Sequence, residues 1–193
     1  MLSLIKSELR AVLLKKRAEL NSHYRQQAEI EAVSLLSKSS LFMQSQHCAC
    51  YLAMASEFNC FDMITLIWAN QKKCYLPILT PEKKLKFGLY QQYDVLQMNR
   101  YHILEPVVDY LVAAADLDLV ILPLVGFDKS GHRLGMGGGY YDRSFEFIKN
   151  SHRHKKPFLL GVAYACQEIE QLEADPWDIP LNGILTEKNL HIL

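Results

Sequence analysis

Asp118-Leu-Val-Ile-Leu-Pro-Leu-Val-Gly-Phe-Asp-Lys-Ser-Gly-His-Arg-Leu-Gly-Met-Gly-Gly-Gly-Tyr-Tyr-Asp-Arg143 is the stretch of sequence that decides the fold. It begins within the segment 117–122, which is apolar except for Asp118 and is typical of a parallel strand buried on both faces. A loop with glycines between 135 and 139 follows, and residues 141–149 then have the pattern of a helix. A buried strand that leads through glycines into a helix predicts an open α/β sheet. In such a sheet ligands bind beyond the carboxyl ends of the strands.

Helical and extended patterns alternate along the rest of the chain. Residues 4–38 have the pattern of two helices, of which the first carries an apolar stripe at Leu9, Val12 and Leu13. Asn21 interrupts the pattern and is a suitable N-cap for the second helix. We expect strands at 48–54, 73–79, 117–122, 158–164 and 183–186, weaker extended segments at 85–90 and 101–104, and helices at 62–68 (capped by Asp62), 141–149 and 167–173. This alternation predicts a three-layer α/β fold with a mostly parallel sheet and helices on both of its faces.

Length and charge limit the classes of function. The 193 residues suit a single domain, in which residues 1–40 form a helical arm. Lys and Arg number 21 and Asp and Glu number 21, so the net charge of zero argues against nucleic acid as the main partner. We expect a monomer or weak homodimer.

The N-terminus and the cysteines point to the cytoplasm. The segment 1–20 mixes apolar residues with charges that include Glu8 and Glu19, unlike a signal or transit peptide. No apolar run approaches the roughly 20 residues of a membrane span, so no membrane association is expected. The five cysteines include no C-x-x-C pair, which argues against disulfide scaffolding and structural zinc and favours buried, reduced thiols.

The glycine loop has the composition of a phosphate-binding site. Glycines let backbone N–H groups approach phosphate oxygens, and Arg133 adds a cation suited to phosphate. The Walker pattern needs a Lys where Tyr140 stands, and the dinucleotide pattern needs a third glycine at the same position. A turn that merely lets chains cross is the alternative, but it would not require Arg133, Tyr140, Tyr141 and Asp142 as well.

The segment Gly126-Phe-Asp-x-x-Gly-x-Arg-Leu-Gly-x-Gly-Gly-Gly-Tyr-Tyr-Asp142 resembles the signature of the 5-formyltetrahydrofolate cyclo-ligase family. Further matches follow the family's order along the chain: Lys6-x-x-x-Arg10, Leu52 to Glu57, Glu105-Pro106 and Asp178. The resemblance implies a Rossmann-like fold similar to that of sugar-phosphate isomerases and CoA transferases. It also implies a ligase that uses ATP and Mg²⁺ to convert 5-formyltetrahydrofolate into 5,10-methenyltetrahydrofolate, with the helical arm contributing to the ATP site.

The resemblance also assigns roles to residues. ATP would be bound by Lys6, Arg10, Arg133, Leu134, Gly135, Gly137, Gly138, Gly139 and Tyr141. The folate would be bound by Leu52, Glu57, Tyr101, Met136, Gly137, Gly138, Gly139 and Tyr140. Asp142 and Asp178 would bind Mg²⁺, while Arg133 and Tyr140 would position the substrates and stabilise charge without a covalent nucleophile. The chain departs from the family at Met136 and Gly138, which fill variable loop positions, at Trp177, where many members have His, and at Tyr101, which is often Trp.

Simpler roles remain open for several of these residues when they are considered singly. Lys6 and Arg10 could form a solvated helix face, Asp142 a helix cap, Glu57 a solvent-facing acid and Asp178 part of a turn. Two other functions also remain open: a sugar-phosphate isomerase-like enzyme, and a protein that binds folate without catalysis.

Overall fold

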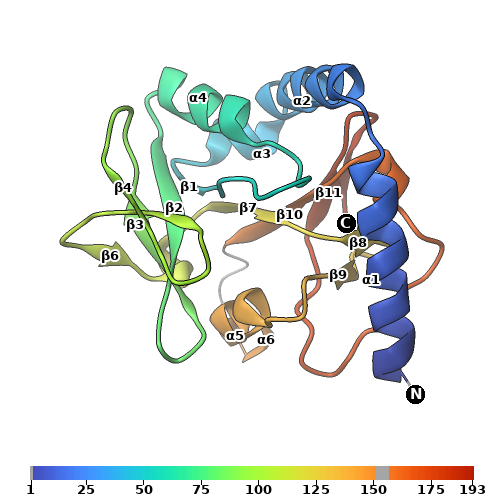
Figure 1. The fold of residues 1–193 in the computed structure, drawn as a ribbon. Coiled ribbons are helices and arrows are strands. Elements are labelled where there is room, and N and C mark those ends of the chain that lie inside the picture. Colours follow the sequence, from blue (N-terminus) through green and yellow to red (C-terminus); the bar gives the residue numbers. More distant parts are fainter. Residues whose placement is uncertain (1, 151–156) are drawn as a thin grey trace.

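The computed structural model describes residues 2–150 and 157–193, which are built around one eight-stranded sheet (Figure 1). Its strand order is β12-β11-β10-β7-β1-β2-β3-β6. The strands are β1 (His47–Ala49), β2 (Lys73–Leu79), β3 (Leu85–Leu89), β6 (Leu111–Val112), β7 (Leu119–Pro123), β10 (Phe158–Val162), β11 (Gly183–Leu185) and β12 (Leu190–Ile192). The central strands from β11 to β2 run parallel, whereas β12, β3 and β6 join antiparallel at the two edges. The predicted mostly parallel sheet is therefore confirmed.

Helices cover both faces of this sheet. The helices α2 (Ser22–Ser37), α3 (Ser40–Gln44) and α4 (Phe61–Ala69) share a core with Leu119 and Ile121 of β7. The alternate β7 residues Val120 and Leu122 lie in a second core with α5 (Tyr140–Phe145) and α6 (Phe147–Asn150). Because successive side chains of a strand point to opposite faces, these two cores are the two layers expected for an α/β fold.

Two small elements stand beside the main sheet. The hairpin of β8 (Gly126–Phe127) and β9 (Arg133–Leu134) leads into the glycine loop, and β4 (Leu96–Met98) pairs with β5 (Leu104–Pro106). The long helix α1 (Leu2–Ala18) lies next to β8 and β9 in Figure 1, where Leu13 is buried against Gly126. This arrangement brings the N-terminal helix to the glycine loop. Short 3₁₀ turns occur at Ala114–Asp116 and Ala165–Gln167.

The prediction of a helix over 167–173 is wrong. Its polar groups bond to a neighbouring segment and not to one another. The Gln167 side-chain amide donates to the carbonyl oxygens of Leu124 and Val125 at 3.0 and 2.9 Å. The N–H of Ile169 donates to the Phe127 carbonyl, also at 2.9 Å. Only the 3₁₀ turn that ends at Gln167 remains, and the segment after it follows β8.

Several element boundaries also differ from the predictions. The strand expected over 48–54 ends at Ala49, the extended segment at 101–104 begins only at Leu104, and β12 follows the strand that was expected to be last. The helix expected over 141–149 is divided at Glu146 into α5 and α6. Asp62 is not a cap, because Cys60 precedes α4 and Asp62 lies in its first turn. Asn21 does cap the second helix, since its Oδ1 accepts the Tyr24 N–H at 2.8 Å.

All five cysteines are free; four of them are buried, as the sequence predicted, whereas Cys166 is partly exposed. Within the described residues, no helix combines the length and hydropathy needed to cross a membrane.

Candidate active site

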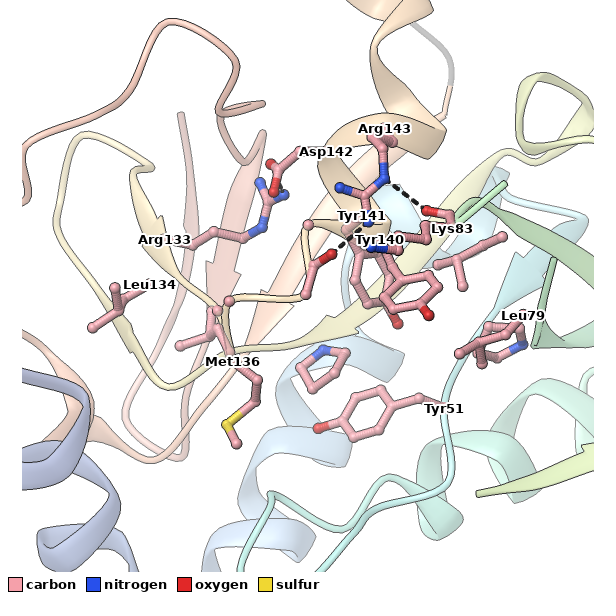
Figure 2. A pocket seen from close by; sticks show the side chains of 18 of the residues that line it. Tyr51, Leu79, Lys83, Arg133, Leu134, Met136, Tyr140, Tyr141, Asp142 and Arg143 are labelled. Carbon is pink, nitrogen blue, oxygen red and sulfur yellow. Dashed lines mark hydrogen bonds and ion pairs between the residues drawn. The ribbon is translucent and has the colours of Figure 1, made fainter. Parts of the chain in front are cut away.

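A single large cavity brings together residues that are far apart in the sequence. It has a volume of about 1300 Å³, and every one of the residues assigned above to ATP, folate or Mg²⁺ lines it. Pockets for one drug-sized ligand usually measure roughly 300–1,000 Å³. A cavity of this size therefore has room for two substrates together. In Figure 2, Arg133 and Asp142 lie on one side of the view, Leu79 on the other, and Tyr140 and Tyr141 between them.

The helix α1 contributes two cations to this cavity. Lys6 and Arg10 lie one turn apart, so both side chains project from the same face of the helix. The Lys6 Nζ pairs with Asp175 Oδ2 at 2.6 Å and Asp178 Oδ2 at 3.3 Å, and Arg10 Nε donates to the Gly135 carbonyl at 2.7 Å. These contacts hold α1 against the glycine loop and the segment 175–178, so a freely solvated helix face is not the arrangement found.

Lys6 remains charged in this environment. Partial burial disfavours the ammonium form, but hydrogen bonds and attraction from Asp175 and Asp178 outweigh it and raise the pKa of Lys6. An ammonium group that faces a cavity suits a phosphate ligand.

A second ion pair joins the residues that flank the two ends of the glycine loop. The guanidinium of Arg133 bonds to Asp142 Oδ1 and to the Ile179 carbonyl, and its side chain is only 6% exposed. Asp142 Oδ1 also accepts the Ile179 N–H at 3.1 Å. Figure 2 shows the Arg133 and Asp142 side chains pointing toward one another. This pair fixes the segment around Ile179 beside the loop.

The two predicted metal ligands, Asp142 and Asp178, are neighbours. Asp142 accepts a hydrogen bond from the backbone N–H of Ile179, which is the residue after Asp178. Among the described residues, no group of three or more His, Cys, Asp or Glu side chains could hold a metal ion alone. Mg²⁺ commonly takes one or two protein carboxylates and completes its shell with phosphate and water. The residues present therefore fit a Mg²⁺ ion that arrives with a nucleotide. Asp178 also has the turn role considered above, since its Oδ2 accepts the Asp175 N–H at 2.8 Å.

Glu57 lines the cavity from a tight loop that follows β1. Its Oε2 accepts the Met54 N–H at 2.9 Å, its own N–H donates to the Met54 carbonyl at 2.9 Å, and Ala55 has a φ of 47°. Burial raises the pKa of Glu57, although the Met54 N–H and the charge of Arg17 counteract this effect. Glu57 is therefore a partly buried, anchored carboxylate and not a solvent-facing acid.

Aromatic side chains occupy the cavity wall between these groups. The Tyr101 and Tyr140 hydroxyls lie 3.3 Å apart and their rings meet edge to face, with centroids 6.5 Å apart. The Arg143 guanidinium lies 5.5 Å from the Tyr140 ring centroid. Tyr141 stacks on Phe145 at a centroid distance of 6.3 Å. The wall thus offers flat faces and hydroxyls to a ring system.

Other lining residues were not predicted from the sequence. They include Tyr51, Lys83, Arg143, Asp175 and Trp177. Asp175 lies three residues before Asp178, and this spacing is its only signal in the sequence. Glu105, which lies in a segment matched to the family, is not among the lining residues; its Oε1 accepts the Leu79 N–H and the Asn99 amide, both at 2.8 Å.

Two of the loop glycines adopt positive φ, with Gly137 at 92° and Gly139 at 65°. The helix α5 that follows has only six residues, so its dipole is a smaller source of positive potential than a long helix would give. Approach to a ligand therefore depends on the loop backbone and the cations around it.

Gly137→Ala is expected to lower the free energy of unfolding by about 1–2 kcal/mol, because an L-residue is strained at this φ. The new methyl group would meet only Arg10, at 3.8 Å, so backbone strain is the main effect. Gly135→Ala is the matched control, since its Cβ would have no neighbour within 4 Å and its φ is not positive. Urea denaturation of both variants measures the difference; equal stabilities would contradict the prediction.

Known proteins resemble this chain over nearly its whole length. The 5-formyltetrahydrofolate cyclo-ligase family model matches residues 3–187. The 5-formyltetrahydrofolate cyclo-ligase of Haemophilus influenzae is 35% identical over 185 residues, which cover 93% of this chain and 96% of that protein. The protein of that name from Escherichia coli K12 is 33% identical over 179 residues, covering 91% and 96%. The solved structure of Aquifex aeolicus 5,10-methenyltetrahydrofolate synthetase is similar with a TM-score of 0.84 and 32% identity, covering 98% of this chain and 93% of that one. The chain therefore belongs to the 5-formyltetrahydrofolate cyclo-ligase family.

Proposed function

We propose that this protein binds ATP, Mg²⁺ and 5-formyltetrahydrofolate in the one cavity and converts the folate into 5,10-methenyltetrahydrofolate, ADP and phosphate. One observation supports this most strongly. A single cavity of about 1300 Å³ is lined both by the cations Lys6, Arg10 and Arg133 and by the anchored carboxylate Glu57. The cations suit a polyphosphate, and the carboxylate suits a heterocycle with N–H donors.

The chemistry needs alignment more than a nucleophilic side chain. The formyl oxygen on N5 is a poor leaving group, and transfer of the γ-phosphoryl group to it gives an N5-iminium phosphate. N10 then attacks the activated carbon, loses its proton, and phosphate leaves as the ring closes. Arg133 and the loop amides would stabilise charge on the transferred group, and Tyr140 would hold the folate in line with it.

Mg²⁺, when bound with ATP, would neutralise charge on the β- and γ-phosphates. Asp142 and Asp178 are the carboxylates placed to hold it. Arg133 and Lys6, which pair with these carboxylates in the free protein, would then be available to the phosphate oxygens.

Asp142→Asn is expected to raise the Mg²⁺ concentration that gives half-maximal activity about tenfold or more, because the amide keeps the shape of the side chain but loses the charge. Titration of MgCl₂ at fixed ATP measures this shift. Asp109→Asn, at an exposed position outside the cavity, is the control. An unchanged Mg²⁺ profile in Asp142→Asn would assign the metal elsewhere.

Near-ultraviolet absorbance of the methenyl product tests the reaction itself. Purified protein, 5-formyltetrahydrofolate, Mg²⁺ and ATP together should give a rise that is absent when any component is omitted. Binding of the folate without a rise would support the non-catalytic folate binder. Neither binding nor a rise would favour the sugar-phosphate isomerase-like enzyme, which needs no ATP.

We further propose that residues 1–193 act as one domain, with the arm at 1–40 contributing to the ATP site. We also propose that the protein is located in the cytoplasm and is a monomer or a weak homodimer. The five free cysteines suit a reducing compartment.

A further inference from the structure

Arg17 is a buried cation that lies behind the cavity, outside its lining. It is 4% exposed and sits seven residues after Arg10 on α1, so both residues lie on the same face of the helix. Leu13, between them, is 1% exposed. A charged residue is rarely buried to this extent unless it is paired or hydrogen-bonded. The partners of Arg17 therefore indicate what it does.

The contacts of Arg17 lead to the loop that carries Glu57. Its Nε donates to Ser56 Oγ at 3.1 Å, and its Nη1 donates to the Leu124 carbonyl at 3.3 Å, just beyond the end of β7. Ser56 directly precedes Glu57. Arg17 thus ties the Glu57 loop to the carboxyl end of a central strand. Desolvation lowers the pKa of Arg17, whereas attraction to Glu57 is the largest effect that opposes this shift.

Arg25 holds the same loop in a different way. Its Nη1 donates to the Ser56 carbonyl at 3.0 Å and its Nη2 donates to the Arg17 carbonyl at 2.6 Å. Its guanidinium lies 5.7 Å from the Tyr164 ring centroid. Arg25 therefore bonds to the backbone of the loop, whereas Arg17 bonds to the Ser56 side chain and its charge lowers the pKa of Glu57.

We propose that Arg17 is a positioning residue of the folate site, which orients the Glu57 carboxylate for the N–H groups of the pterin-type ring from a place outside the cavity. The proposal rests on the proposed role of Glu57. It gives α1 two tasks: Lys6 and Arg10 serve the phosphate region, and Arg17 serves the folate region about two turns further along the helix. The charged and titratable groups around Glu57 are Arg17 on α1, Tyr51 after β1, Cys60 before α4 and Tyr141 on α5.

Removing the charge of Arg17 should affect the folate and not the nucleotide. In Arg17→Met, which keeps an unbranched apolar chain, we expect the KM for 5-formyltetrahydrofolate to rise at least tenfold and the KM for ATP and kcat to stay within about threefold. The acid limb of kcat/KM for the folate should move to higher pH, because burial of Glu57 would no longer be opposed by a neighbouring cation. Arg17→Lys should return the acid limb toward its original position. Equal increases in both KM values, or an unmoved acid limb in Arg17→Met, would overturn the proposal.

Two further variants keep the test decisive. Ser56→Ala removes only the acceptor of the Arg17 Nε and should raise the folate KM by a smaller factor, so it replaces Arg17→Met if that variant fails to fold. Arg25→Met is the structural control, and it should leave the acid limb where it is. If Glu57→Gln weakens folate binding but the Arg17 and Ser56 variants do not, the role of Arg17 is wrong and the folate site stands. If Glu57→Gln itself has no effect on folate binding, the assignment of Glu57 fails and the role of Arg17 fails with it.

Discussion

Arg133→Ala is expected to lower kcat by about 10²- to 10³-fold. This is the usual effect of removing one preorganised hydrogen-bond donor that stabilises the charge developing in the transition state. Its guanidinium lines the cavity at the start of the glycine loop and is held by Asp142 and the Ile179 carbonyl. The Ile179 carbonyl would still hold the guanidinium once Asp142 binds Mg²⁺, so little reorganisation energy is needed when the transferred phosphoryl group gains charge. The KM for the folate should change little, because Arg133 is proposed to contact the phosphate region.

The stability of the same variant separates catalysis from folding. Loss of Arg133 leaves the Asp142 carboxylate with the Ile179 N–H, so a cost of about 1–3 kcal/mol in the free energy of unfolding is expected. Arg133→Lys is the matched variant, because it keeps the charge but cannot make the forked contact. It should recover stability better than turnover. Turnover equal to that of the parent in Arg133→Ala would remove this residue from the mechanism.

The residues that line the cavity were easier to predict from the sequence than the details of the fold. The strand β7, the glycine loop and Asp142 fall within one stretch of sequence, so that stretch contributes both to the cavity wall and to the centre of the sheet. The partners of these residues could not be predicted in the same way. Asp175, for example, meets Lys6 across 169 positions of the chain, and no local pattern records that contact.

The first helix shows why periodicity alone was insufficient. Its apolar residues predicted a buried stripe that included Val12, yet Val12 is 51% exposed and the charged Arg17 is 4% exposed. The buried face follows the contacts of Arg17 with Ser56 and Leu124, which are 39 and 107 positions away. The prediction of a helix over 167–173 failed for the same physical reason, because the Gln167 side chain donates hydrogen bonds to the Leu124 and Val125 carbonyls. In both places tertiary hydrogen bonds override the local preference.

Glu57→Gln is expected to raise the KM for 5-formyltetrahydrofolate about 10- to 100-fold, because hydrogen bonds to a charged acceptor contribute about 1.5–3 kcal/mol and the amide replaces one acceptor oxygen with a donor. The KM for ATP should be unaffected, which separates this variant from those of the phosphate region. Glu19→Gln is the control, because Glu19 directly follows α1 and its side chain is 64% exposed. A folate KM within twofold of the parent would show that Glu57 does not bind the substrate.

The stability of Glu57→Gln should reveal the environment that the carboxylate occupies in the free protein. Burial raises the pKa of Glu57 above its value in the unfolded chain, roughly 4.3, so folding favours the protonated form. The parent should therefore lose stability from this group as the pH rises from the unfolded value through the raised folded value. The glutamine variant cannot titrate, yet its side-chain oxygen can still accept the Met54 N–H. It should match or exceed the parent in free energy of unfolding at neutral pH, and its advantage should vanish in acid. Denaturant titrations of both proteins across pH 4 to 8 would measure this difference in the free energy of unfolding. If the glutamine variant instead loses stability relative to the parent as the pH rises, the ionised carboxylate stabilises the folded protein.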